Sequence, residues 1–275
     1  MDYRFSLAGL LVGFLIGLTG MGGGSLLAPI LILFFRIPPL WAVATDITYS
    51  SVTKGLGSIV HIRQKHTNFR VALWLACGSV PATLLSVFLV RSVQRQYGSV
   101  INGVILHAIG FTLLFVAVLL VTKPYILRFL DRRKHEQIRT EAALDLSDAP
   151  SNKVASWQKY RPLLTALVGA TVGFLVGLTS VGSGTLIIVS MTFLYPRLTP
   201  KELVGTDIFQ AFLLLLAGAV GYLNSGAINW PIVGLLLLGS LPGVYLGSKL
   251  SKFIPDRYMR PVLAVVLGLS AWKLI

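Results

Sequence analysis

The sequence predicts an all-α integral membrane protein, and three observations lead to that fold class. The chain has 275 residues, of which 55% are hydrophobic and only 12% are charged, whereas a soluble domain carries about 25% charged residues. Several apolar runs reach the ~20 residues that a helix needs to cross a bilayer, and they lack the alternation of membrane β-strands. The third observation is an internal duplication, which divides the chain into two homologous four-segment repeats.

The duplication is visible in two matched stretches. Val12–Leu26 (VGFLIGLTGMGGGSL) and Val172–Leu186 (VGFLVGLTSVGSGTL) are identical at ten of fifteen positions, at an offset of 160 residues. At an offset of 161 residues, Thr45–Ile47 matches Thr206–Ile208. Chance similarity between apolar helices gives matching Leu and Val, but it does not give matching Asp and Gly in one register. The repeat is therefore the basis of the domain organisation.

The two repeats cover residues 1–122 and 162–275, and a polar, basic linker covers residues 123–161. The apolar segments lie at about 5–35, 41–62, 69–90 and 98–122 in the first repeat, and at about 162–195, 200–223, 229–250 and 257–275 in the second. The linker carries many charges of both signs, so we expect a solvated or partly disordered connection. Thr199, Pro200 and Glu202 predict a helix start with Thr as the N-cap.

The first segment of each repeat is longer than one crossing requires. A helix over residues 5–35 would measure roughly 46 Å, against a hydrocarbon core of ~30 Å, and a glycine-rich stretch lies in its middle. Two arrangements are open. The segment is either one long, tilted, broken helix that crosses the membrane, or a re-entrant hairpin of two half-helices that returns to its starting side.

The distribution of Lys and Arg favours the hairpin. The formal net charge of +14 comes from the polar connections, which is the positive-inside bias of membrane proteins and not the signature of nucleic-acid binding. If the first segment crosses, 14 of the Lys and Arg residues in the connections lie on one side of the membrane and 9 on the other, and the short loops are more basic on the side opposite the linker. If it is a hairpin, the division is 18 to 5, and the short loops are more basic on the same side as the linker. Three crossings then remain in each repeat, which predicts an inverted repeat, a cytoplasmic linker and extracytoplasmic termini.

The glycine-rich stretches are the strongest local motif. Consecutive glycines break a helix and let backbone approach a ligand, and the half-helix that follows presents its positive N-terminus to an anion. Close helix packing is the alternative interpretation. The candidate substrate-binding residues of this motif are Gly20, Gly22, Gly23, Gly24 and Ser25 in the first repeat, and Ser180, Gly182, Ser183, Gly184 and Thr185 in the second.

Asp46 and Asp207 occupy matching positions, each about two turns inside an apolar segment and each preceded by a threonine, Thr45 or Thr206. A carboxylate inside a membrane is costly and is therefore a functional candidate. A second role is equally open, in which each carboxylate anchors the adjacent glycine-rich loop by accepting its N–H groups. All four residues belong to the candidate substrate site.

Lys54 is the only Lys or Arg inside an apolar span of the sequence. It continues a polar helix face that starts at Asp46 and passes through Ser50. The second repeat has Leu215 at the position of Lys54 and Ala211 at the position of Ser50, so the shared scaffold does not demand these polar groups. Lys54 is therefore a candidate ligand for an anion; a structural ion pair with Asp46, two turns away, is the alternative.

These motifs resemble a known family. GLTGMGGGSLLAP, then ATDITYSSVTKGLGSIVH and GSVP, with a degenerate second copy containing VGTDI and GSLPG, are similar to the sulfite exporter TauE/SafE family over nearly the whole chain except the linker. The resemblance implies a secondary transporter that moves sulfite, sulfonates or related small oxyanions across a bacterial inner membrane. An anion channel, whose filter would use backbone carbonyls, and a non-transporting scaffold or receptor are the alternatives.

No catalytic residue, metal site or cofactor is expected. Cys77 is the single cysteine, so the sequence offers neither a disulfide nor a cysteine-based metal centre. A Ser183–His107 hydrolase pair is disfavoured, because the first repeat has Gly23 at the serine position. The expected partners are a small sulfur oxyanion and the lipid bilayer, and not nucleic acid. A coupling proton or cation and a homo-oligomeric assembly stay open.

Overall fold

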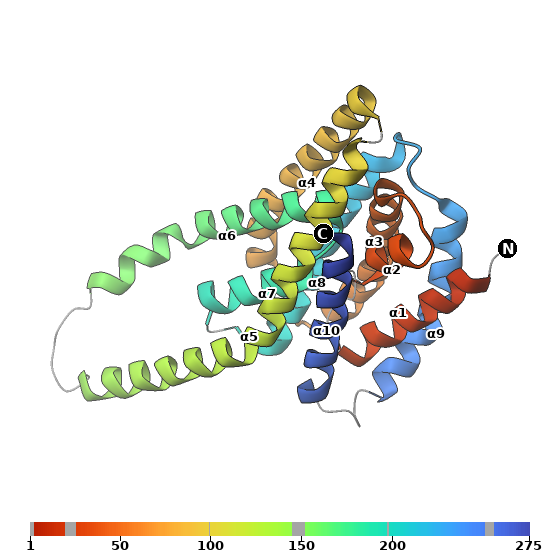
Figure 1. Ribbon diagram of the computed structural model, residues 1–275. Helices are drawn as coiled ribbons and strands as arrows, with labels where there is room; N and C mark the ends of the chain where they lie inside the picture. The colour runs from red at the N-terminus through yellow and green to blue at the C-terminus, as the bar shows by residue number, and fades with distance from the viewer. Residues whose placement is uncertain (1–2, 20–25, 99, 145–151, 197, 251–255) are drawn as a thin grey trace.

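The computed structural model describes residues 3–19, 26–98, 100–144, 152–196, 198–250 and 256–275, and the regular structure in these ranges is entirely helical. In chain order the helices are α1 (Tyr3–Thr19), α2 (Leu27–Leu33), α3 (Pro39–Arg63), α4 (Phe69–Tyr97), α5 (Val100–Leu144), α6 (Asn152–Thr179), α7 (Ser183–Leu194), α8 (Pro200–Leu223), α9 (Trp230–Leu250) and α10 (Asp256–Leu274). They follow the predicted apolar segments, and both long first segments are interrupted where the glycine-rich motifs lie (Figure 1).

The helices have the length and surface of membrane-spanning elements. Within the described residues, five stretches are long and apolar enough to cross a bilayer: Phe69–Tyr97, Val100–Thr122, Tyr160–Thr179, Pro200–Leu223 and Trp230–Leu250. Large apolar side chains such as Leu11, Phe111 and Leu269 are exposed on the outer surface. An outward apolar surface is what lipid contact requires, and the expectation of an all-α integral membrane protein is confirmed.

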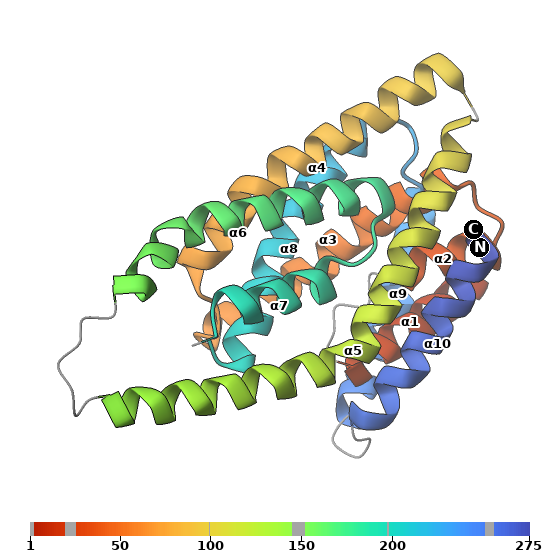
Figure 2. The same cartoon turned by 60° about the vertical axis from the view of Figure 1, so that its left-hand side comes forward.

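Each broken segment forms a hairpin. The rings of Phe5, near the start of α1, and Phe35, just after α2, stack at 4.4 Å between centroids. The matched residues of the second half also meet, because Thr165 Oγ1 and Tyr195 Oη are 2.8 Å apart. Figure 2 shows α7 running back beside α6 after the break. A crossing helix would separate these residues by roughly 45 Å at 1.5 Å per residue, so the hairpin arrangement is the one observed.

Short loops of the two halves meet reciprocally at opposite ends of the bundle. The Asn68 N–H at the start of α4 donates to Thr206 Oγ1 of α8 at 3.0 Å. The Asn229 N–H at the start of α9 donates to Thr45 Oγ1 of α3 at 3.4 Å. The α3–α4 loop and the start of α8 therefore lie together, which groups these basic loops as the hairpin prediction requires. The membrane side that each group faces stays a prediction.

The two halves exchange helices. The α1 helix packs along α9 and α6 packs along α4, while α3 faces α8 and α5 faces α10 (Figures 1 and 2). The contacts are backbone to backbone: a Cβ on Gly13 would collide with the Ser240 backbone, and a Cβ on Gly173 would collide with the Ser79 backbone. Small residues at four-residue spacing allow this approach. Such an exchange is the pattern expected of duplicated halves, although the duplication itself rests on the sequence.

The predicted start of α8 is confirmed. Glu202 N–H donates to Thr199 Oγ1 at 3.3 Å, and Thr199 N–H donates to Glu202 Oε2 at 2.8 Å. This capping box satisfies two N–H groups that the first turn of a helix leaves without intrahelical acceptors.

The linker, which the sequence predicts to be a solvated or partly disordered connection, is helical over its described part. The α5 helix continues to Leu144 and α6 begins at Asn152, so most of the 123–161 segment is helical and extends beyond the bundle (Figure 1). The physical reason lies in the composition of residues 123–144, where Lys, Arg, Glu and Leu have high helix propensity and prolong a helix that the apolar span has already nucleated.

Candidate functional site

A polar stripe on α3 forms one wall of the candidate site. Asp46, Ser50 and Lys54 follow one another at four-residue spacing, and all three are buried. Ser50 Oγ donates to one carboxylate oxygen of Asp46 at 3.0 Å. Other hydroxyls of α3 donate to carbonyls of their own helix, as Thr48 does to Ala44. The helix can therefore hold its polar residues without opening its backbone ladder.

The break between α6 and α7 forms the opposite wall. Ser180 and Gly182 have φ values of 60° and 93°, so the chain passes through left-handed conformations at two of three consecutive residues. Glycine adopts such a φ without penalty, and a non-glycine residue there stores strain. The α7 helix then starts at Ser183, and its N-cap residue, Gly182, has no side chain to accept from the first turn.

Lys54 connects the two walls. Its ammonium donates to Ser183 Oγ, the first residue of α7, at 2.6 Å. The carboxylates of Asp207 and Asp46 also lie within electrostatic reach of this ammonium. Lys54 is only 6% exposed, so its charge is compensated inside the protein.

Asp207 of α8 lies against the same turn of α7. A Cβ placed on Gly184 would stand 3.3 Å from Asp207 Oδ2, so a side chain at this position would press on the carboxylate. Asp46, Ser50, Lys54, Ser183 and Asp207 therefore form one buried group, which we call the Lys54 cluster. It joins α3 of the first half to α7 and α8 of the second.

Asp46 also touches both hairpins. Its neighbours include Ser180 at the break of the second hairpin and the backbone of Ala28 in α2. Asp46 is fully buried and Ser180 is 3% exposed. Among the described residues, neither Asp46 Oδ2 nor Ser180 Oγ has a hydrogen-bond partner of acceptable geometry. Two buried polar atoms without partners of acceptable geometry are costly, and a bound water, ion, proton or ligand beside them would relieve that cost.

The remaining predicted site residues fall into three groups. Thr45 and Thr206 bond the starts of α9 and α4, so they connect loops of the two halves and do not join the Lys54 cluster. Thr185 is buried in the first turn of α7. The predicted residues outside the described ranges are Gly20, Gly22, Gly23, Gly24 and Ser25.

A second polar layer was not predicted. Tyr49 and Gln210 occupy matching positions at the 161-residue offset, and both are buried. Gln210 Nε2 donates to Ser79 Oγ at 2.6 Å, and Tyr49 lies beside Ser240, which matches Ser79 in the repeat. Tyr49 Oη and Gln210 Oε1 have no partner among the described residues. The repeat offset was the signal that could have found this layer.

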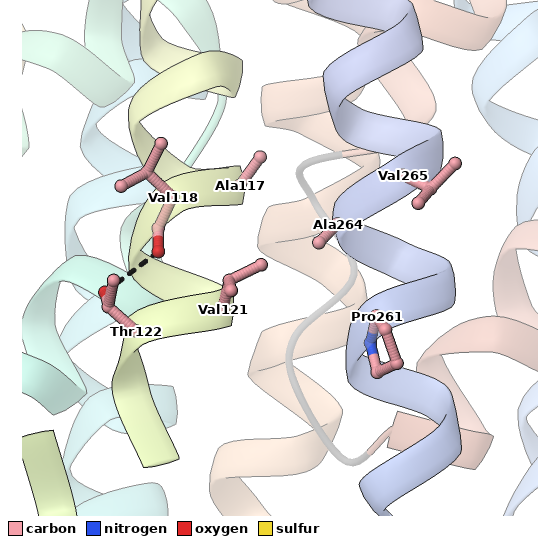
Figure 3. Close-up of a pocket in the computed structure, with 7 residues that line it drawn as sticks. All are labelled: Ala117, Val118, Val121, Thr122, Pro261, Ala264 and Val265. Atoms are coloured by element: carbon pink, nitrogen blue, oxygen red, sulfur yellow. Dashed lines mark hydrogen bonds between the residues drawn. The ribbon is translucent and has the colours of Figure 1, made fainter. Parts of the chain in front are cut away.

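An open cavity of about 390 Å³ between α5 and α10 is unsuited to an anion (Figure 3). Its lining is Ala117, Val118, Val121, Thr122, Pro261, Ala264 and Val265. The Thr122 hydroxyl donates to the Val118 carbonyl of its own helix at 2.8 Å. The lining thus supplies no charge, whereas the Lys54 cluster offers a buried ammonium to an oxyanion.

The sequence is similar to known membrane transporters over almost its whole length. The family model described as sulfite exporter TauE/SafE matches residues 5–274. The chain is 36% identical to the probable membrane transporter protein YjnA of Bacillus subtilis over the whole of both chains. It is 21% identical to the probable membrane transporter protein YdhB of the same organism, over 96% of each chain. It is 24% identical to the probable membrane transporter protein MJ0441 of Methanocaldococcus jannaschii, over 95% of this chain and 91% of the relative. No solved structure matches the chain.

Proposed function

The chain belongs to the sulfite exporter TauE/SafE family of membrane transporters, and from that premise we propose that it is a secondary transporter of a small sulfur oxyanion. Sulfite and short organosulfonates are the proposed substrates, and a bacterial inner membrane is the proposed location. The anion binds at the Lys54 cluster, between the two halves. The family indicates a transporter and not an enzyme.

The observation that carries this proposal is the position of Lys54. Its ammonium is buried between the halves and donates to Ser183 at the first turn of α7. A buried ammonium is costly unless an anion accompanies it. The N-terminus of α7 adds partial positive charge directed at the same point. An oxyanion that takes the place of the Ser183 hydroxyl would therefore meet an ammonium and the free N–H groups of a helix start.

The burial of the Lys54 cluster supports a carrier over a channel. Its members are Asp46, Ser50, Lys54, Ser183 and Asp207, and the most exposed of them reaches only 6%. A channel requires a continuous wet path past its binding groups. A site closed from both sides is the occluded state of a carrier, in which access alternates as the two halves move against each other.

A counterflow measurement tests the proposal. Purified protein in liposomes preloaded with unlabelled sulfite should take up external ³⁵S-sulfite, and the initial rate should saturate with concentration. Unlabelled methanesulfonate should compete, because it presents the same three-oxygen face. A conductance that does not saturate would assign a channel, and an absence of flux for sulfite, sulfate and methanesulfonate would assign a scaffold or receptor.

A further inference from the structure

The Lys54 cluster holds more negative than positive charge. Among the described residues it contains two carboxylates, Asp46 and Asp207, and one ammonium, Lys54. All three are at most 6% exposed, so water does not screen them. With every group ionised the cluster carries one surplus negative charge before a substrate arrives. An anion that binds there raises the surplus to two charges in a low-dielectric core, which is strongly unfavourable.

The two carboxylates are not equivalent. Asp207 lies against the first turn of α7, beside Gly184. Of the two carboxylates that attract the Lys54 ammonium, Asp207 has the larger electrostatic effect. Asp46 uses one oxygen to accept from Ser50, and its Oδ2 atom has no partner among the described residues. Asp46 is thus the carboxylate that receives less compensation from the Lys54 ammonium and from the N-terminus of α7.

The surroundings of Asp46 also suit its protonated form. Ser180 Oγ lies beside Asp46, is buried and lacks a hydrogen-bond partner among the described residues. A protonated Oδ2 can donate to this hydroxyl, just as the ionised form can accept from it, so the protonated form keeps a hydrogen-bonding neighbour. Ser180 stands at the break between α6 and α7 with a φ of 60°, so Asp46 on α3 lies directly beside the second hairpin.

No other cation in the described surroundings can neutralise Asp46. The titratable groups on α3 near Asp46 are Lys54 and Tyr49, and the neighbouring helix α8 supplies Asp207. The other charged or titratable side chains described on helices that pack against α3 lie elsewhere. His107 of α5 and Tyr245 and Lys249 of α9 are exposed. The starts of the apolar spans of α6 and α8 carry Tyr160, Arg161, Lys201 and Glu202, and Tyr222, near the end of α8, donates to the Gly177 carbonyl. The described residues contain no cluster of three His, Cys, Asp or Glu that would hold a metal ion. A proton needs only one carboxylate oxygen as its binding place, and Asp46 Oδ2 provides one.

We propose that each monoanion crosses together with one proton, which is carried on Asp46 Oδ2. This inference rests on the proposed function and names its coupling partner. The anion binds to the Lys54 ammonium, so the ammonium no longer compensates the negative charge of Asp46. Asp46 then takes up a proton from the same side of the membrane. Both are released on the other side, so one O–H bond forms and the same bond breaks. Cargo and proton together are neutral, and the loaded cluster carries no more charge than the empty one.

The test uses methanesulfonate, whose conjugate acid is strong, so any pH dependence belongs to the protein. Proteoliposomes receive ³⁵S-methanesulfonate under an inwardly directed proton gradient, and a pH dye trapped in the lumen reports proton entry. We expect one proton per anion and about tenfold accumulation for each pH unit, since one unit is ~1.4 kcal/mol. Accumulation should not respond to membrane potential. A ratio of zero, or accumulation driven by a sodium gradient instead, would overturn the proposal.

Variants assign the proton to Asp46. Asp46→Asn should lose accumulation driven by the proton gradient to a far greater extent than it loses methanesulfonate exchange. Asp46→Glu should recover proton-driven accumulation, because its carboxylate titrates. Thr122→Val, which removes a hydroxyl from the apolar cavity between α5 and α10, should behave as the wild type. Proton-driven accumulation that persists in Asp46→Asn would overturn the assignment.

Failure of the coupling can be told apart from failure of the function. Wild-type exchange of methanesulfonate without proton entry would refute the coupling and leave the transporter intact. The absence of flux for sulfite and for methanesulfonate would refute both. If Asp46→Asn does not fold, the one-to-one ratio of the wild type and the behaviour of Asp46→Glu still decide the question.

Discussion

Replacing Lys54 with methionine removes a buried ammonium and leaves an unbranched side chain of similar length. The lost hydrogen bond, from Lys54 Nζ to Ser183 Oγ, is 2.6 Å long. A hydrogen bond made by a charged group contributes about 1.5–3 kcal/mol. If the substrate anion takes the place of this acceptor, Lys54→Met weakens its binding by the same amount, which is roughly 10- to 100-fold at ~1.4 kcal/mol per decade.

The same change also affects stability. Asp207 and Asp46 lose the cation that they share, and removal of one partner from a buried ion pair costs about 3–5 kcal/mol. We therefore expect Lys54→Met to unfold at a lower temperature than the wild type. The double change Lys54→Met with Asp207→Asn removes one of the stranded carboxylates. It should regain stability without regaining affinity.

Thermal unfolding in detergent, with and without sulfite, measures both effects. A ligand at 100 times its Kd stabilises the folded state by about 2.7 kcal/mol, and the same concentration stabilises by only about 0.4 kcal/mol when Kd rises 100-fold. The ligand-induced rise in melting temperature should thus nearly disappear in the single and in the double variant. Wild-type affinity in the double variant would refute the reasoning, because Lys54 would then act only as a counter-ion to the carboxylates.

Three further predictions concern the fold. Gly173→Ala places a methyl group against the Ser79 backbone, and it should lower the free energy of unfolding by about 3 kcal/mol or more, which would be seen as loss of monodisperse protein in detergent. Gly103→Ala is the control, because nothing lies within 4 Å of the added methyl group, and it should leave stability unchanged. Cysteines at positions 5 and 35, where Phe5 and Phe35 now stack, should cross-link under mild oxidation in a background without the native cysteine, and a helix that crosses instead would leave them apart. Reporter fusions should place the linker in the cytoplasm and the C-terminus outside; one shared side for both would contradict the charge-based topology.

Most of the fold could be predicted because lipid restricts a chain to few solutions. The apolar runs indicate the helices, and the count of Lys and Arg selects hairpins over crossing segments, which the stacking of Phe5 on Phe35 bears out. The exchange of helices was not predicted, although Gly169, Gly173 and Gly177 repeat at the four-residue spacing of close packing. Such a spacing marks a packing face on one helix, but it does not say which other helix covers that face.

The candidate site could be predicted in part. Polarity inside an apolar span identified Asp46 and Lys54, but it could not show that Lys54 meets Ser183, 129 residues further along the chain. Tyr49 and Gln210 were not predicted, because a repeat is recognised by identical residues and these two share only a position and a polar tip. Thr45 was assigned to the site by its neighbour in sequence, although a residue adjacent to Asp46 on a helix points about 100° away.

The exchange of helices makes the two halves complementary fragments. The α1 helix has its partner α9 in the other half, and α6 has its partner α4. A half expressed alone would leave glycine-lined backbone faces with no partner inside the membrane. If the chain is divided within the linker, the two polypeptides should assemble into an obligate heterodimer and restore transport together. The covalent connection would then act only as a tether that keeps the fragments at high local concentration.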